Sequence, residues 1–335
     1  SKLKKISLFF DENLAKPIFM NSERLETLLA RIQQLRIAVM GDFALDFYFD
    51  IQTSTGEYSL ETAKEVHLAS SPRSYLGGAG NVAKNLAILG AQVSAFGVRG
   101  NDLFGREMAY QMATLGIDAT NIQVTDIDTP TYSKPLRKEE ELNRIDFGTR
   151  SSQFQLHTST LLVALLANAF DWIILNEQFS IPLLQAEHIE SINNQKALAD
   201  LRSLGSHANQ LPLKVNEAEF IKIHQKPATH ENIQAWAVSR NKAVLVTLGE
   251  KGMVYASVQE FHHQPAFPVK GPIDTVGAGD MVVAGFSAAR AAGATVEEAC
   301  ELASLAVHIS IHQMGETGSA SPEAIRQLHH GHSIA

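Results

Sequence analysis

Residues 274–286 read DTVGAGDMVVAGF, a glycine-rich turn followed at once by an apolar segment with helical character. Gly277 and Gly279 reach backbone angles that other residues avoid, so this turn is able to present consecutive amides. Their amides, with those of Ala278 and Asp280, would form an anion cradle at the N-terminus of a helix. Such a cradle suits the charge that develops in phosphoryl transfer, and a carboxylate beside it is suited to accept a hydroxyl proton. The alternative is an ordinary helix start with a favourable aspartate.

Outward from this turn, strand-like and helix-like segments alternate along most of the chain. Buried strands are indicated by apolar runs at 36–42, 93–100, 171–176, 211–216 and 243–249. Helices are predicted at 21–35, 106–116, 159–169, 182–193, 230–240, 278–292 and 296–314. This alternation predicts a three-layer α/β/α fold with a mostly parallel central sheet covered on both faces. Strand-like inserts at about 47–75 and 129–148 are predicted to join into a small sheet, a lid over the site.

The chain has 335 residues, which suits one large α/β domain with a small appendage. We expect an N-terminal extension with a helix at 1–35, a main domain at 36–328 and a frayed polar tail at 329–335. Asp11 and Glu12 follow the first lysines too soon for a signal peptide, and no apolar run reaches the length of a membrane span.

Charge and cysteine content restrict the possible partners. A net charge of −8 argues against nucleic-acid binding, although a local basic pocket would still fit an anionic substrate. The single cysteine, Cys300, permits no intrachain disulfide and lies in an alanine-rich segment, where we expect core packing rather than a nucleophile. We therefore predict a cytoplasmic protein with a small-molecule substrate and with neither a nucleic-acid nor a membrane partner.

A second glycine-rich turn, GGAGNVAKNLAILG, begins at Gly77. Gly77 and Gly78 would let a ligand approach the backbone, and Asn81 offers an amide at the start of a helix. Upstream, Asp42 and Asp46 follow the first strand, at the edge of the sheet where open α/β proteins bind ligands. We expect Asp42 to cap a turn and Asp46 to bind ligand hydroxyls.

The two glycine-rich turns together resemble the signatures of the ribokinase-like (PfkB) family of carbohydrate kinases, and the second signature is highly specific. The shorter motifs FGVRGNDLFG, VNEAEF and VTLGEKG follow between them in the family's order, and the resemblance extends from about residue 36 to 325. It implies the ribokinase-like fold, ATP and magnesium as cofactors, and transfer of the γ-phosphate to a hydroxymethyl group of a sugar or sugar phosphate.

The resemblance also assigns roles to single residues. Asp280 would be the catalytic base, and the anion hole would consist of Gly277, Ala278 and Gly279. Asn216 and Glu219 match an element that orders magnesium and its waters. Positions beside the nucleotide are matched by Thr247, Gly249 and Gly252, and sugar contacts by Asp46, Gly78 and Asn81. Asp274, with the loop after Met314, resembles a monovalent-cation site that takes K⁺, with simple turn structure as the alternative.

Several motifs resemble the heptose-7-phosphate kinase branch of this family, among them GDFALDFY, NRIDFGTR and ETGSASPEAI. Arg137 and Arg144 would then hold a substrate phosphate, because guanidinium groups pair bidentately with phosphate; the alternative is that both are solvated on the lid. The chain departs from the branch at 54–73, where a proline-rich segment is usual, and we expect no nucleotidyltransferase domain within these residues.

Two alternatives share the fold. A nucleoside kinase of the same family would favour a more apolar pocket than the polar, basic lid predicted here. The other alternative is a binding or regulatory protein of the same fold that has lost catalysis. The intact DTVGAGD motif is evidence against it.

A third alternative is a nicotinamide-dependent dehydrogenase, because GAGNVA (78–83) fits the dinucleotide fingerprint and Asp102 lies near its acidic position. The fingerprint must directly follow a strand, whereas the preceding SSPRSYL is polar and contains proline. It would also leave DTVGAGD unexplained, and there is no P-loop motif.

Two further expectations concern metal binding and assembly. His308 and His312 are four residues apart on a predicted helix, where packing is favoured over metal binding. Lid strands with exposed edges often pair with another subunit, so we predict a homodimer through the lid.

Overall fold

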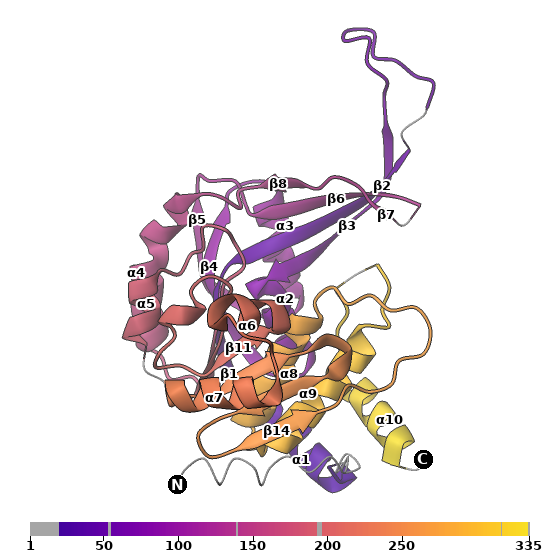
Figure 1. The fold of residues 1–335 in the computed structure, drawn as a ribbon. Helices are drawn as coiled ribbons and strands as arrows, with labels where there is room; N and C mark the ends of the chain where they lie inside the picture. Colours follow the sequence, from indigo (N-terminus) through magenta and orange to yellow (C-terminus); the bar gives the residue numbers. More distant parts are fainter. Residues whose placement is uncertain (1–19, 53–54, 139, 193–195, 316, 334–335) are drawn as a thin grey trace.

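The computed structural model describes residues 20–52, 55–138, 140–192, 196–315 and 317–333 (Figure 1). The expectations for residues 1–19 therefore lie outside the described part of the chain. The chain forms a large central sheet flanked by helices, and a second, smaller sheet continues into a hairpin that projects away from the body (Figure 1).

The central sheet has nine strands in the order β14-β13-β12-β11-β10-β9-β1-β4-β5. Their bounds are β1 Arg36–Gly41, β4 Gln92–Gly100, β5 Asp118–Thr125, β9 Trp172–Asn176, β10 Ala197–Asp200, β11 Leu213–Asn216, β12 Val244–Thr247, β13 Met253–Ala256 and β14 Phe261–Gln264. All neighbours pair in parallel except those of β13 and β14, which are antiparallel. The predicted mostly parallel sheet is confirmed.

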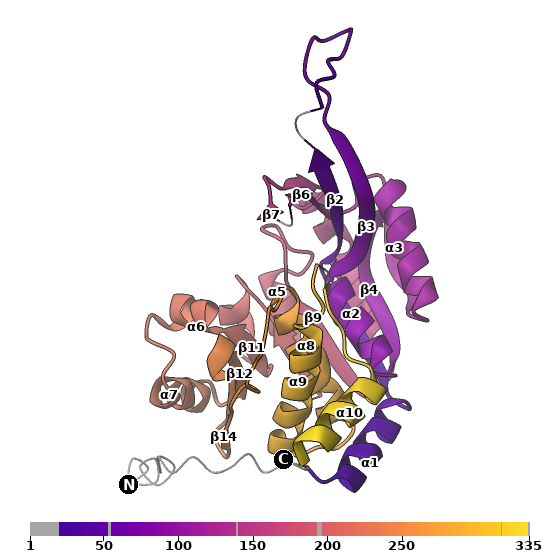
Figure 2. The ribbon, with the colours of Figure 1, turned by 90° about the vertical axis from the view of Figure 1, so that its right-hand side faces the viewer.

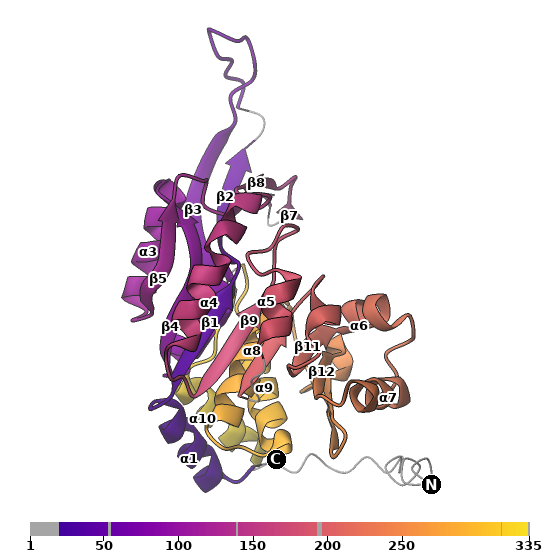
Figure 3. The same cartoon turned by 90° about the vertical axis from the view of Figure 1, so that its left-hand side faces the viewer.

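Helices cover both faces of this sheet, and each face has its own hydrophobic core. One face is covered by α1 Ser22–Ile32, α2 Ala79–Ile88, α3 Leu103–Thr114, α8 Ala278–Ala291, α9 Val296–Ser310 and α10 Pro322–Ser333 (Figure 2). The other is covered by α4 Thr158–Leu166, α5 Ala186–Ser191, α6 Glu217–His224 and α7 His230–Arg240 (Figure 3). Short 3₁₀ turns lie at Ser152–His157, Gly205–His207 and Gly249–Lys251.

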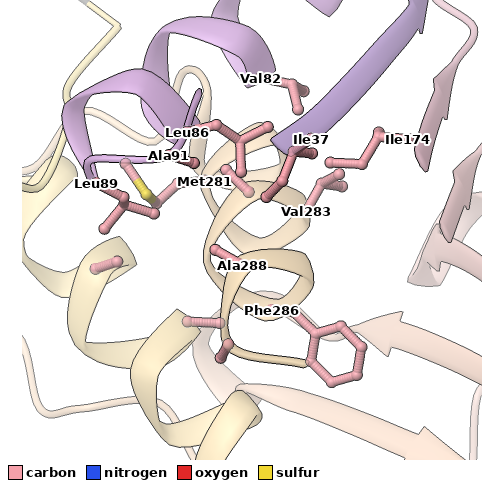
Figure 4. Close-up of a cluster of buried hydrophobic side chains, with 14 of the residues drawn as sticks. Ile37, Val82, Leu86, Leu89, Ala91, Ile174, Met281, Val283, Phe286 and Ala288 are labelled. Atoms are coloured by element: carbon pink, nitrogen blue, oxygen red, sulfur yellow. The ribbon is translucent and has the colours of Figure 1, made fainter. Parts of the chain in front are cut away.

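The first core joins the two glycine-rich signatures. Ile37 of β1, Leu86 of α2 and Met281 of α8 lie close together within it (Figure 4). All three side chains are fully buried. Because α2 and α8 each begin with a signature, their packing places both signatures at the same end of the sheet.

The smaller sheet has the strand order β3-β2-β6-β7, with β8 also paired to β6. Its strands are β2 Phe43–Gln52, β3 Leu68–Gly78, β6 Thr131–Arg137, β7 Glu140–Glu141 and β8 Ile145–Phe147. The two predicted inserts do join into one sheet. The hairpin tip contributes only an isolated bridge between Tyr58 and Glu65, so the strand-like pattern predicted there was too long.

Several local predictions were wrong, and the terminal helix α10 is among the elements that were not predicted. Strands β5 and β10 were missed, because β5 is a half-exposed edge strand with a polar sequence and β10 has only four residues. Helix α6 was also missed. The expected frayed tail from residue 329 instead continues α10 to Ser333, and His329 is buried. No helix in the described ranges is long and apolar enough to cross a membrane.

Candidate active site

Asp280 lies in the first turn of α8, and this helix begins directly after a left-handed residue. Gly277, the N-cap, has φ 80°, which glycine adopts without strain. Asn81 of α2 donates from Nδ2 to Asp280 Oδ2 at 2.7 Å. A Cβ at position 277 would lie 2.8 Å from that Asn81 nitrogen. Glycine is therefore required there both for its backbone angle and for the contact between the two signatures.

The electrostatic surroundings of Asp280 favour a proton acceptor that works near neutral pH. Burial raises the pKa of Asp280 to about 6, and the nearby Asp200 carboxylate also raises it. The hydrogen bond from Asn81 and the charge of Lys214 oppose this shift. The side chain is half-buried, since it is enclosed by protein yet lines an open cavity. A carboxyl group with this pKa is ionised at pH 7 and still basic enough to take a proton.

Asp280 lines a cavity of about 630 Å³ between the main sheet and the lid. Its wall is rich in charged side chains of both signs. The predicted site residues in this wall are Asp46, Gly78, Arg144, Asn216, Glu219, Gly277, Gly279 and Asp280. Residues from the lid, the first half and the second half of the chain therefore meet in one place, as a bound polar ligand would require.

A second, mainly apolar cavity of about 670 Å³ adjoins the first. It is lined by the predicted nucleotide-side residues Thr247, Gly249 and Gly252, by Ala278 of the predicted anion hole, and by apolar side chains from α8 and α9. Gly252 has φ 90°, and a Cβ there would lie 2.0 Å from the Gln264 carbonyl oxygen. Both cavities share Lys214, Asn216 and Gly279, so the two spaces meet at these residues.

Lys214 of β11 is the cation at this boundary. Its side chain is buried, and Nζ lies 3.0 Å from Asp200 Oδ1 at the end of β10. A Cβ on Gly279 would lie only 3.2 Å from this nitrogen. Burial alone would lower the pKa of Lys214, but the charge of Asp200 and of neighbouring carboxylates raises it, so the ammonium stays charged.

Asn216 and Glu219 form a capping box at the start of α6. Asn216 Oδ1 accepts from the Glu219 amide at 2.8 Å, and Glu219 Oε2 accepts from the Asn216 amide at 2.8 Å. This local motif turns both side chains toward the cavity boundary. It leaves the other Glu219 oxygen without a partner in the capping box.

Four predicted residues lie outside both cavity walls: Gly77, Asn81, Arg137 and Asp274. Gly77 nevertheless lets the chain pass close to Asp46, because a Cβ there would lie 3.0 Å from Asp46 Oδ2. The Asp274 oxygens accept from the amides of Val276 and Gly315 at 3.0 and 3.2 Å, which ties two loops together. A monovalent cation beside Asp274 stays a prediction.

Arg144 and Arg137, predicted as a phosphate-binding pair, have different surroundings. Arg144 lines the charged cavity, stacks over the Tyr132 ring at 4.4 Å and forms a two-point ion pair with Asp146. Arg137 is exposed on β6 opposite Glu140 of β7. Arg144 therefore lines the charged cavity and Arg137 does not, and a role for either in binding a substrate phosphate stays a prediction.

Sequence reasoning missed eight charged residues of the charged cavity: Lys134, Asp146, Arg150, Glu177, Asp200, Arg202, Lys214 and Lys222. Lys214 was visible as a lysine within an apolar strand, a position where lysine is rare unless it is paired. Asp200 was hidden because the short strand β10 was not predicted. Lys134 lies on a lid strand whose pairing the sequence does not reveal.

The other side chains singled out from the sequence have structural surroundings. Cys300 is fully buried, as expected of a core residue. His308 packs against Phe267 and His312, and the described residues contain no cluster of three or more potential metal ligands. Asp42 is a structural residue, since its carboxylate accepts from the amides of Gln178, Phe179 and Leu183.

The expectation that no strand precedes the GAGNVA fingerprint is wrong. Residues 68–78 form strand β3, so the GAGNVA fingerprint does follow a strand. That strand is antiparallel to β2 in the lid sheet, whereas the dinucleotide motif requires a parallel strand of the main sheet.

The comparisons with known proteins agree with this geometry. Residues 35–324 match the family described as pfkB family carbohydrate kinase. The Bifunctional protein HldE of Shewanella baltica (strain OS185) is 27% identical over 322 residues, which cover 91% of this chain and 66% of that protein. HldE of Shewanella denitrificans is 28% identical, with 92% and 67% covered. The chain thus spans about two thirds of the length of these curated relatives.

Solved structures show the same fold. A ribokinase from Thermotoga maritima has a TM-score of 0.68 at 23% identity, covering 88% of this chain and 99% of its own. A nucleoside kinase from Burkholderia thailandensis has a TM-score of 0.68 at 20% identity, with 88% and 99% covered. The predicted ribokinase-like fold is therefore confirmed. Since the family match extends over most of the sequence, the chain belongs to the pfkB family of carbohydrate kinases.

Proposed function

We propose that this protein transfers the γ-phosphoryl group of ATP to a hydroxyl of a sugar or sugar phosphate, with Asp280 as the general base. The observation that carries the proposal is the position of Asp280. It stands in a charged cavity at a helix N-terminus, next to Gly279, which that cavity shares with an apolar one. A base, an anion cradle and two adjoining binding spaces are the parts that phosphoryl transfer requires.

The apolar cavity suits the base and ribose of ATP. Its lining of small and apolar side chains leaves room for a flat ring, and its boundary with the charged cavity carries the groups that suit phosphates. Lys214 and the amides of Gly277, Ala278 and Gly279 would hold the transferred group. Glu219 is the carboxylate suited to magnesium and its waters, since this ion is usually bound through one or two carboxylates and the substrate phosphates.

The role of Asp280 follows from its pKa and its hydrogen bond. Asn81 holds one carboxylate oxygen, which fixes the orientation of the group. Asp280 would take the proton of the acceptor hydroxyl as that oxygen attacks the phosphorus atom. Closure of the lid would exclude water and so limit hydrolysis of ATP.

The acceptor is proposed to be polar and anionic. Arg144, Arg150 and Arg202 all line the charged cavity. Guanidinium groups suit a phosphate on the acceptor, whereas a nucleoside base would find little apolar surface in this wall.

The first test is ADP release from ATP and magnesium across a panel of free sugars, sugar phosphates and nucleosides. Turnover on a sugar or sugar phosphate is expected. Turnover on nucleosides alone would support the nucleoside kinase alternative. No turnover on any compound, with ATP still bound, would favour the catalytically silent protein.

The pH dependence of turnover should report the Asp280 carboxyl group. Because its pKa is raised to about 6, the base is ionised above that pH and protonated below it. We expect kcat/KM to be constant near pH 7–8 and to fall about tenfold per unit below about pH 6. A profile that stays flat down to pH 5, measured where the protein remains folded, would contradict the assignment of the base.

We also propose a homodimer formed through the lid. The lid hairpin projects far from the body (Figures 1–3), and its tip exposes Tyr58 and Leu60 at 62% and 103%. Light scattering at working concentration is expected to give twice the monomer mass. Leu60→Asp should shift the mass toward the monomer, whereas Leu103→Asp, at an exposed site on α3, should not. A monomeric native protein would refute the proposal.

A further inference from the structure

A buried ion pair lies on the cavity side of the lid. Lys134 of β6 places Nζ 2.7 Å from Asp46 Oδ1 of β2, and both residues are less than a tenth exposed. The same nitrogen donates to the Tyr48 hydroxyl at 2.9 Å and lies 4.7 Å from the centre of the Tyr48 ring. The parallel pairing of β2 with β6 places Lys134 opposite Tyr48, two residues from Asp46 on the same strand face.

The pair is only partly satisfied by the protein. A lysine ammonium has three donors, and the described residues take two of them, at Asp46 and at Tyr48. The second carboxylate oxygen, Asp46 Oδ2, accepts no hydrogen bond from the described part of the chain. Asp46 and Lys134 both line the charged cavity. One donor and one acceptor are therefore left side by side, facing the space proposed for the acceptor substrate.

The charge state of the pair is well defined. Burial would lower the pKa of Lys134, but the charge of Asp46 and the contacts with Tyr48 raise it above its usual value. The lysine therefore stays protonated at neutral pH and cannot accept a hydrogen bond. The subsite thus has a fixed polarity, with the donor on β6 and the acceptor on β2.

We propose that Lys134 determines acceptor specificity, by requiring two neighbouring oxygens on the substrate. One is a hydroxyl that donates to Asp46 Oδ2, and the other is an oxygen that accepts from Lys134 Nζ. This inference rests on the proposed kinase function and adds a residue that the sequence did not single out. Because Lys134 occupies Oδ1, Asp46 has only Oδ2 left to accept a hydrogen bond from a substrate hydroxyl.

Lys134 acts here as a specificity residue and not as a catalytic one, because it lies on the lid. Its loss should raise the KM for the acceptor about 10- to 100-fold, the range expected for a hydrogen bond to a charged group. The KM for ATP should change less than about twofold, because the nucleotide cavity has no lid residue in its wall.

The experiment compares the acceptor found in the panel with its monodeoxy analogues. For the wild type, kcat/KM is expected to be about 10- to 100-fold lower with the analogue that lacks the accepting oxygen than with the full acceptor. Lys134→Met should reduce that discrimination to about threefold or less, and Lys134→Arg should restore most of it. Lys226→Met, at an exposed lysine between α6 and α7 and away from the lid, is the matched control and should behave as the wild type.

A variant that leaves Asp46 buried without its partner is at risk of misfolding. The double variant Asp46→Asn, Lys134→Met removes both charges and keeps the two shapes. Each protein is therefore checked by thermal melting before kinetics, and the double variant should also discriminate poorly.

The outcomes separate this inference from the proposed function. If the wild type phosphorylates an acceptor but Lys134→Met keeps its full discrimination against every deoxy analogue, Lys134 only joins two strands and the inference is wrong. If a folded wild type binds ATP and phosphorylates nothing in the panel, the proposed function itself fails, and the inference fails with it.

Discussion

The substitution Asp280→Asn is expected to lower kcat by about 10²- to 10⁴-fold, the usual contribution of a general base. Asparagine has nearly the same shape as aspartate but cannot take a proton from the acceptor hydroxyl. The change removes a carboxyl group that burial holds at a pKa of about 6. It should leave the protein folded, since a half-buried charge is replaced by a neutral amide of similar size.

Single-turnover kinetics and calorimetric titration with ATP would test this expectation. ATP affinity should stay within about threefold of the wild type, because the apolar cavity does not include Asp280. Asp126→Asn, at an exposed aspartate after β5, is the matched control and should retain full activity. Turnover above a tenth of the wild-type value in Asp280→Asn would remove Asp280 from the role of base.

Lys214→Met is expected to lower kcat/KM for ATP about 10²- to 10³-fold, the range found when one group that stabilises transition-state charge is removed. Lys214 is the only lysine that lines both described cavities, where it lies 3.0 Å from Asp200. Its loss would remove a positive charge from the boundary where the phosphoryl group passes. It would also leave Asp200 buried without its cation, at a cost of about 3–5 kcal/mol in stability.

Two controls separate these effects. The double variant Asp200→Asn, Lys214→Met leaves no unpaired buried charge, so its melting temperature should recover while its activity stays low. Lys226→Met, at an exposed lysine between α6 and α7, should match the wild type in both respects. If the double variant regained wild-type turnover, Lys214 would serve stability alone.

Local patterns predicted much of the fold correctly. The alternation of apolar strands and amphipathic helices is a property of neighbouring residues, and it was sufficient to predict a mostly parallel sheet between helices. It failed where the signal was weak, as in the four-residue strand β10 and the polar edge strand β5. The tail after residue 328 was predicted to be frayed because its residues are polar. It is instead part of α10, which packs against α1 and α9.

The sequence by itself determined the glycine-rich turns, because a positive φ at Gly277 and a helix directly after it are local requirements. It also determined the capping box of Asn216 and Glu219, whose partners are three residues apart. Only the tertiary structure decided which distant side chains meet. Asn81 and Asp280 are 199 positions apart, and Tyr48 and Lys134 are 86 apart. Such pairs depend on strand order, register and helix packing, which arise from the whole core and leave no trace in the spacing of neighbouring residues.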